Sequence, residues 1–124
     1  MYMSAFAAQQ MAKQQPHGDR EERGVIINLS SLTYQVGNPG VFAYSASKGA
    51  IVSMTMPMAK DLIPHRIRVN TIVPGFFETA MTTKYGEALH WDELSPFSKA
   101  GKPEDFAKMV QHIVENGSMN GCIV

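Results

Sequence analysis

The sequence has little of several features on which whole classes of function depend. It contains one cysteine, Cys122, so no intrachain disulfide can form and a reducing compartment is expected. Eleven basic residues balance eleven acidic ones, which argues against a general electrostatic attraction to nucleic acid or to an anionic membrane. No apolar run reaches about 18 residues, so no membrane span is expected. We therefore expect neither a nucleic-acid partner nor a membrane partner.

Patterns for metal binding and for targeting are also scarce. The four histidines do not stand at ligand spacing, so no metal site is predicted. The N-terminal stretch MYMSAFAAQQMAKQQ lacks the basic leader and the long apolar centre of a signal peptide. We interpret it as the remainder of a helix whose beginning lies outside the chain.

What is present indicates one α/β domain. A length of 124 residues fits a single domain, and an apolar fraction of 44% is enough to build a core. Helical patterning predicts helices over residues 2–15, 41–62 and 102–116. Short β-branched runs predict buried strands over residues 24–31 and 66–75, with the start of a third at 120–124. Strands that alternate with helices predict a parallel sheet.

The stretch FAYSASKGA places a tyrosine, Tyr44, four residues before a lysine, Lys48. On a helix these positions share one face, with Cβ atoms about 5–6 Å apart. An ammonium group at that distance stabilises a phenolate, which makes tyrosine a usable proton donor or acceptor at neutral pH. Because such a pair can also be two surface neighbours, the prediction of chemistry depends on its context.

The two predicted strands each end in residues that suit a ligand site. Ser30 and Ser31 follow the first strand, at the carboxyl end where open α/β sheets bind ligands. A serine hydroxyl there could bond a substrate oxygen beside the tyrosine, or merely cap a turn. After the next strand, Pro74 and Gly75 predict a tight turn that a ligand can approach closely. Thr79 could donate to an amide or a phosphate, or cap a helix.

Taken together, INLSS, YSASK, RVNTIVPG and PGFFET, with Tyr44 thirteen positions after Ser31, resemble the short-chain dehydrogenase/reductase family. The similarity runs from about residue 24 to the last residue. It implies an α/β fold that corresponds to the C-terminal half of a Rossmann-like, doubly wound parallel sheet, with three strands and flanking helices. The segments most similar to the type-2 3-hydroxyacyl-CoA dehydrogenase branch are GVIIN, AYSASKGAIVSMT and VENGSMNG. Bacterial 3-oxoacyl carrier-protein reductases resemble much of the same sequence.

The resemblance implies an oxidoreductase that uses NAD or NADP, with NAD favoured, and acts on a secondary alcohol or ketone such as a 3-hydroxyacyl-CoA or a hydroxysteroid. Tyr44 would be the general acid/base, Lys48 would stabilise its phenolate and hold the nicotinamide ribose, and Ser31 would orient the substrate oxygen. The other cofactor-binding positions would be Leu29, Ser30, Pro74, Gly75, Phe76 and Thr79. Residues 79–100 would form a substrate-side lid, with the apolar candidates Phe76, Phe77, Met81 and Trp91.

The sequence departs from the family pattern in its dinucleotide site. It has no glycine-rich turn after a first strand, where such enzymes bind the pyrophosphate, and no residue to select NAD over NADP. Residues 1–124 are therefore interpreted as one partial domain that lacks the N-terminal dinucleotide-binding half. Two hypotheses stay open: the catalytic half of an oxidoreductase, or a truncated non-catalytic module that assembles with full-length subunits.

Assembly and location follow from the same resemblance. The small residues Ala46, Gly49, Ala50 and Ser53 suit close helix packing, and the family implies a homo-oligomer through this helix, or assembly with a full-length homologue. The expected location is mitochondrial, with cytoplasmic as the alternative. The first predicted strand would expose one edge, which predicts marginal stability for the isolated chain.

Overall fold

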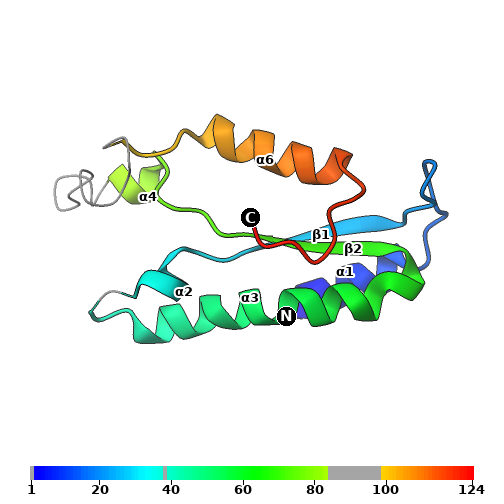
Figure 1. Cartoon of the computed structure of the whole chain (residues 1–124), viewed down its shortest axis with the longest axis horizontal. Helices are drawn as coiled ribbons and strands as arrows, with labels where there is room; N and C mark the ends of the chain where they lie inside the picture. Colours follow the sequence, from blue (N-terminus) through cyan, green and yellow to red (C-terminus); the bar gives the residue numbers. More distant parts are fainter. Residues whose placement is uncertain (1, 38, 84–98) are drawn as a thin grey trace.

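The computed structural model describes residues 2–37, 39–83 and 99–124. Its elements follow the order α1 (Tyr2–Met11), β1 (Gly24–Leu29), α2 (Thr33–Val36), α3 (Phe42–Leu62), the 3-10 helix η1 (Ile63–His65), β2 (Ile67–Ile72), α4 (Ala80–Thr83) and α6 (Pro103–Glu115). Helices α1 and α3 lie on one side of the two strands and α6 lies on the other (Figure 1). The predicted α/β class is confirmed.

The sheet is parallel, as predicted. Strands β1 and β2 pair in register from Gly24 opposite Ile67 to Leu29 opposite Ile72. The connection between them contains α3, which is the kind of crossover that a parallel pair requires. All six residues of β2 are buried, because helices cover the strand on both faces.

The third strand predicted at residues 120–124 forms only in part. The segment runs beside β2, where Thr71 donates its amide to the Cys122 carbonyl (2.9 Å) and accepts from the Val124 amide (3.0 Å). Only one isolated parallel bridge results, between Thr71 and Ile123. The prediction of a chain segment paired to the sheet was right, and the prediction of a regular strand was too strong.

Side-chain amides replace part of the missing ladder. Asn120 Oδ1 accepts from the Val69 amide at 2.9 Å, and the Cys122 amide donates to Asn70 Oδ1 at 3.0 Å. Because asparagine side chains occupy these positions, the backbone groups of the last segment do not all face those of β2. Because side-chain oxygens of Asn70 and Asn120 take the place of backbone carbonyls in these two bonds, the segment is anchored to β2 without forming a full strand.

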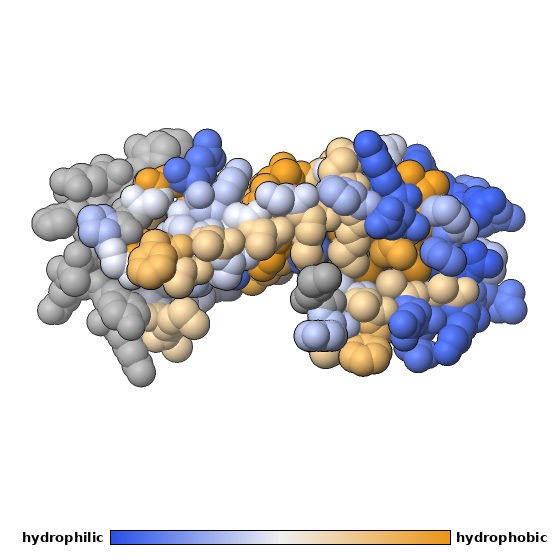
Figure 2. All heavy atoms as spheres, turned by 90° about the horizontal axis from the view of Figure 1, so that it is seen from below, coloured by the Kyte–Doolittle hydropathy of each residue, from blue (hydrophilic) through white to orange (hydrophobic). Residues whose placement is uncertain are grey.

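The apolar core lies between the sheet and the helices α1 and α3. Its buried members are Ile26, Ala59, Ile67 and Val69, and the half-buried side chains packed on them are Ala8, Met11, Ala12, Met58 and Leu62. Seen from below, the side formed by α1 and α3 is apolar over its middle and hydrophilic toward one end (Figure 2). The core thus secures β1 and β2 to α3, which carries the candidate residues of the site.

The predicted helices are confirmed with shifted ends. The first ends at Met11, since the amides of Lys13 and Gln14 bond carbonyls three residues back and tighten the last turn. At the other end of the chain, α6 begins with Pro103 and two acidic residues, as predicted. Within the described ranges, no helix has the length and apolarity needed to cross a membrane.

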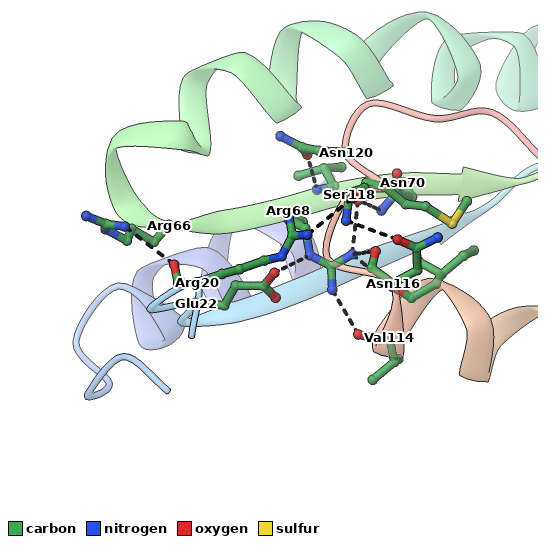
Figure 3. A network of polar contacts seen from close by, with 12 residues as sticks. Arg20, Glu22, Arg66, Arg68, Asn70, Val114, Asn116, Ser118 and Asn120 are labelled. Carbon is green, nitrogen blue, oxygen red and sulfur yellow. Dashed lines mark hydrogen bonds and ion pairs between the residues drawn. The ribbon is translucent and has the colours of Figure 1, made fainter. Parts of the chain in front are cut away.

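Arg68 docks α6 onto the sheet. Its guanidinium is buried, with the residue 6% exposed, and donates to Glu22 Oε1 at 2.9 Å (Figure 3). It also donates to the carbonyls of Ile113 (2.8 Å), Val114 (3.0 Å) and Met119 (3.0 Å). A cation at the carboxyl end of a helix is favourable, and these partners compensate for the loss of water.

Replacement of Arg68 should therefore destabilise the chain strongly. We expect Arg68→Met to lower the free energy of unfolding by about 3 kcal/mol, because Glu22 and several carbonyls lose a buried partner. The matched control is Arg66→Met, whose ion pair with Glu21 is exposed and should contribute less than about 1 kcal/mol. Urea unfolding of both variants measures the difference, and equal losses would contradict the assigned role.

The free edge of β1 is expected to limit the thermal stability of the chain. β1 pairs with β2 on one side, and no strand of the described residues pairs with its other side. An unpaired edge leaves backbone donors and acceptors without partners in the sheet. We therefore expect the isolated chain to melt below about 60 °C when followed by circular dichroism. A sharp, reversible transition above that temperature would refute this expectation.

Candidate active site

The parallel pairing brings two loops together at the carboxyl edge of the sheet. Beyond the last paired residues, Ser30 still donates its amide to the Ile72 carbonyl at 2.9 Å. Two residues later, the Leu32 amide donates to the Pro74 carbonyl at 3.1 Å. The predicted site residues that follow β1 and those that follow β2 therefore lie side by side.

Two hydrogen bonds attach α3 to this edge through Lys48. The Lys48 ammonium donates to the Leu29 carbonyl at 3.0 Å, and the Ser30 hydroxyl donates to the backbone carbonyl of Lys48 at 2.8 Å. Ser30 is only 2% exposed, so its hydroxyl is committed to this contact. Both ends of the lysine residue are thus fixed relative to the end of β1.

Tyr44 and Lys48 share a face of α3, as their spacing requires. The Lys48 Nζ atom lies 5.6 Å from the centroid of the Tyr44 ring, within the range of a cation–π contact. Tyr44 is 48% exposed, so a ligand can reach its phenol. The arrangement offers a proton-transferring group with a cation held beside it.

The Ser31 hydroxyl has Thr33 as its partner. The two side-chain oxygens are 3.0 Å apart, and the Thr33 amide donates to Ser31 Oγ at 3.3 Å. No hydrogen bond among the described residues joins Ser31 directly to Tyr44. The sequence pointed to Ser31 but missed Thr33, although a serine hydroxyl commonly bonds the backbone two residues further along the chain, as it does here.

A mainly apolar pocket of about 340 Å³ opens beyond the ends of β1 and β2, a volume within the usual range for ligand sites. Ser31, Tyr44 and Lys48 are not among its lining residues. Its lining comprises Leu29, Pro74, Gly75, Phe77, Thr79, Met81, Thr82, Pro103 and Phe106. Four of the predicted cofactor-binding residues, Leu29, Pro74, Gly75 and Thr79, are among them. The structure therefore brings one hydrophobic part of the predicted site together at the ends of β1 and β2.

Two of the apolar lid candidates, Phe77 and Met81, line this pocket, whereas Phe76 does not. The Phe76 carbonyl accepts from the Gly101 amide at 2.8 Å. Phe77 packs edge-on against Phe106, with ring centroids 5.7 Å apart and planes at 84°. Phe106 also lines the pocket and was missed, because helical patterning predicts its helix but not what that helix faces. Trp91, predicted for the lid, lies outside the described residues.

Among the described residues, no group of three or more His, Cys, Asp or Glu side chains could hold a metal ion. The available groups are a phenol, an ammonium, hydroxyls and an apolar pocket. Such a set can bind a flat ring beside a polar oxygen and can transfer a proton to or from that oxygen.

Removal of the Ser30 hydroxyl should weaken the attachment of α3. We expect Ser30→Ala to lower the free energy of unfolding by about 1 kcal/mol, since the Lys48 carbonyl loses a buried donor. The control is Ser47→Ala, because the exposed Ser47 hydroxyl makes only a local bond to the Tyr44 carbonyl. If urea denaturation gave the same small change for both variants, Ser30 would not be the attachment point.

The family comparison gives a match over most of the chain. A family model described as short chain dehydrogenase matches residues 1–90. The human 3-hydroxyacyl-CoA dehydrogenase type-2 is 46% identical over 106 residues, which cover 83% of this chain and 41% of the relative. A 3-oxoacyl-(acyl-carrier-protein) reductase of Thermotoga maritima is 39% identical over 105 residues, or 83% of this chain and 43% of that protein.

Solved structures give the same result for the fold. The crystal structure of a 3-hydroxyacyl-CoA dehydrogenase type-2 from Mycobacterium avium superposes with a TM-score of 0.89 at 29% identity, and the match covers 98% of this chain and 47% of that chain. An angucycline C-6 ketoreductase with bound NADP gives a TM-score of 0.70 at 27% identity, covering 81% of this chain and 40% of the other. The chain thus spans less than half the length of these relatives.

Proposed function

The chain belongs to the short-chain dehydrogenase family, and from that premise we propose that it is an oxidoreductase that interconverts a secondary alcohol and a ketone with a nicotinamide cofactor. The observation that carries the proposal is the placement of Lys48. Its ammonium bonds the Leu29 carbonyl at the end of β1 and lies 5.6 Å from the Tyr44 ring centroid. This contact places a cation between the sheet edge and the candidate acid/base.

The proposed roles follow from the groups at the edge. In the oxidative direction, the Tyr44 phenolate oxygen takes the proton of the alcohol, and Lys48 stabilises the phenolate by its charge. The Ser31 hydroxyl donates to the substrate oxygen and so fixes its position. A nicotinamide cofactor held at Leu29, Pro74 and Gly75 would supply the hydride-transfer chemistry of the reaction.

The described residues fit the nicotinamide end of such a cofactor. Leu29, Pro74 and Gly75 give the pocket apolar walls that suit a flat ring, and Thr79 adds a hydroxyl to the lining. A side chain at Gly75 would reach within 3.2 Å of Leu32, so the turn keeps little spare room there. We propose NAD as the cofactor, with NADP as the alternative, and backbone at Ser30 and Phe76 as further contacts.

The substrate proposal rests on the relatives. Two of them are named for acyl substrates with oxygen at carbon 3, one as a hydroxyacyl-CoA dehydrogenase and one as an oxoacyl carrier-protein reductase. We therefore propose a 3-hydroxyacyl thioester as the substrate class, ahead of a hydroxysteroid. Residues 1–124 are, in this proposal, a partial domain that carries the proton-transferring part of the site.

Assembly and location are proposed on the same basis. Three of the small residues predicted to pack against another helix, Ala46, Ala50 and Ser53 on α3, are exposed, and they support contact with a further subunit through α3. We propose a homo-oligomer and a mitochondrial location, in line with the resemblance to the 3-hydroxyacyl-CoA dehydrogenase branch. Size-exclusion chromatography with light scattering tests the first of these.

The activity is tested with residues 1–124 joined to the N-terminal half of the human relative, which supplies a dinucleotide-binding part. NADH oxidation is followed at increasing concentrations of acetoacetyl-CoA, with NADPH in parallel. We expect turnover by the wild-type chain and a loss of kcat of at least about 100-fold in Tyr44→Phe, because the proton donor is removed. Tyr2→Phe is the control, since Tyr2 is exposed on α1. Absence of turnover in the wild type, or full activity in Tyr44→Phe, would overturn the proposal.

A further inference from the structure

Thr33, the first residue of α2, contacts both sides of the candidate site. Its Oγ1 atom lies 3.0 Å from Ser31 Oγ, and its amide donates to the same oxygen at 3.3 Å. Its carbonyl accepts from the Ser45 hydroxyl at 2.7 Å, and Ser45 follows Tyr44 on α3. One residue therefore links the proposed substrate-orienting hydroxyl to the helix that carries the proposed acid/base.

We propose that Thr33 is a positioning residue for the reaction proposed above, on which this inference rests. Its side-chain hydroxyl donates to Ser31 Oγ and thereby leaves the Ser31 proton directed at the substrate oxygen. Thr33 itself does not touch the substrate in this arrangement and acts through Ser31.

The hydrogen-bonding capacity of a hydroxyl explains the effect. A serine hydroxyl has one proton to donate and two lone pairs that can accept. The Thr33 amide occupies one lone pair of Ser31. Either hydroxyl could donate in the 3.0 Å contact between the two side chains, and in the proposed arrangement Thr33 donates and so occupies the other lone pair of Ser31. The only hydrogen bond that the Ser31 hydroxyl can still make is one in which it donates its proton. Because hydrogen bonds in a chain polarise one another, acceptance from Thr33 also strengthens Ser31 as a donor.

The side chain and the backbone of Thr33 can be separated experimentally. The carbonyl of Thr33 accepts from Ser45 Oγ and from the Gly37 amide (3.2 Å), so the backbone holds α2 against α3 without the hydroxyl. Thr33→Val removes the hydroxyl and keeps the branched shape, the amide and the carbonyl. Thr33→Ser keeps the hydroxyl and is the conservative variant.

The test measures kcat and KM for the reduction of acetoacetyl-CoA by NADH, with the same joined protein that tests the proposed function. Thr33→Val should lower kcat about tenfold, the effect of one ordinary hydrogen bond in the transition state, with an unchanged KM for NADH. Thr33→Ser should restore most of the rate. Ser118→Ala, at an exposed position after α6, is the control and should keep the wild-type rate.

A double variant separates positioning from a general structural role. If Thr33 acts through Ser31, then adding Thr33→Val to Ser31→Ala should cause no further loss of kcat, whereas independent structural losses would multiply. Melting midpoints are measured for every variant, and Thr33→Ala replaces any Thr33→Val protein that unfolds at the assay temperature.

The outcomes distinguish the two proposals. If the wild type is active, any one of three results would overturn the positioning role alone. These are full activity in Thr33→Val, no recovery of the rate in Thr33→Ser, or losses of kcat that multiply in the double variant. An inactive wild type would overturn the proposed function and, with it, this inference.

Discussion

The parallel pairing of β1 with β2 is the constraint on which the site depends. Parallel strands end at the same edge, so the residues after Leu29 and those after Ile72 must meet there. The backbone bonds from Ser30 and Leu32 to the second loop extend that contact beyond the strands. Helix α3 lies between the two strands in the sequence and runs back along the sheet. Its Lys48 donates to the Leu29 carbonyl at the same edge. The proximity of the candidate residues is thus a consequence of strand direction.

Arg68 stabilises the opposite part of the sheet. It lies opposite Val25, close to the amino ends of both strands, whereas the candidate site lies beyond their carboxyl ends. Its guanidinium joins β2 to Glu22 and to carbonyls at the end of α6. On the side of α6, β2 is held by this charged side chain together with the buried Ile113 of α6. On the side of α3, it is held by apolar packing and by a buried contact between the Thr55 and Thr71 hydroxyls at 2.6 Å. Stability and proposed chemistry depend on different ends of one strand pair.

The sequence predicted the elements better than it predicted their polar contacts. Periodicity placed α3 and α6 almost to the residue, and the β-branched runs placed both strands. The role of Arg68 could not be foreseen, because all of its partners except Glu22 are backbone carbonyls of residues 113–119, which leave no side-chain pattern. Likewise, the pairing of residues 120–124 involves two asparagine side chains. Helical patterning predicted the helix that carries Phe106, and only the structure shows that this side chain lines the pocket.

The adjacent serines after β1 show how neighbouring identical residues acquire different roles. Successive side chains of an extended segment point in opposite directions. Ser30 is buried and bonds the Lys48 carbonyl, whereas Ser31 is half-buried and bonds Thr33 at the start of α2. The first hydroxyl is used to attach α3, so it is not available to a ligand. The second is the one whose proton can face a substrate. The sequence shows only two serines in succession, so it could not predict which hydroxyl does which. The burial and the hydrogen-bond partners of each serine in the structure distinguish the two roles.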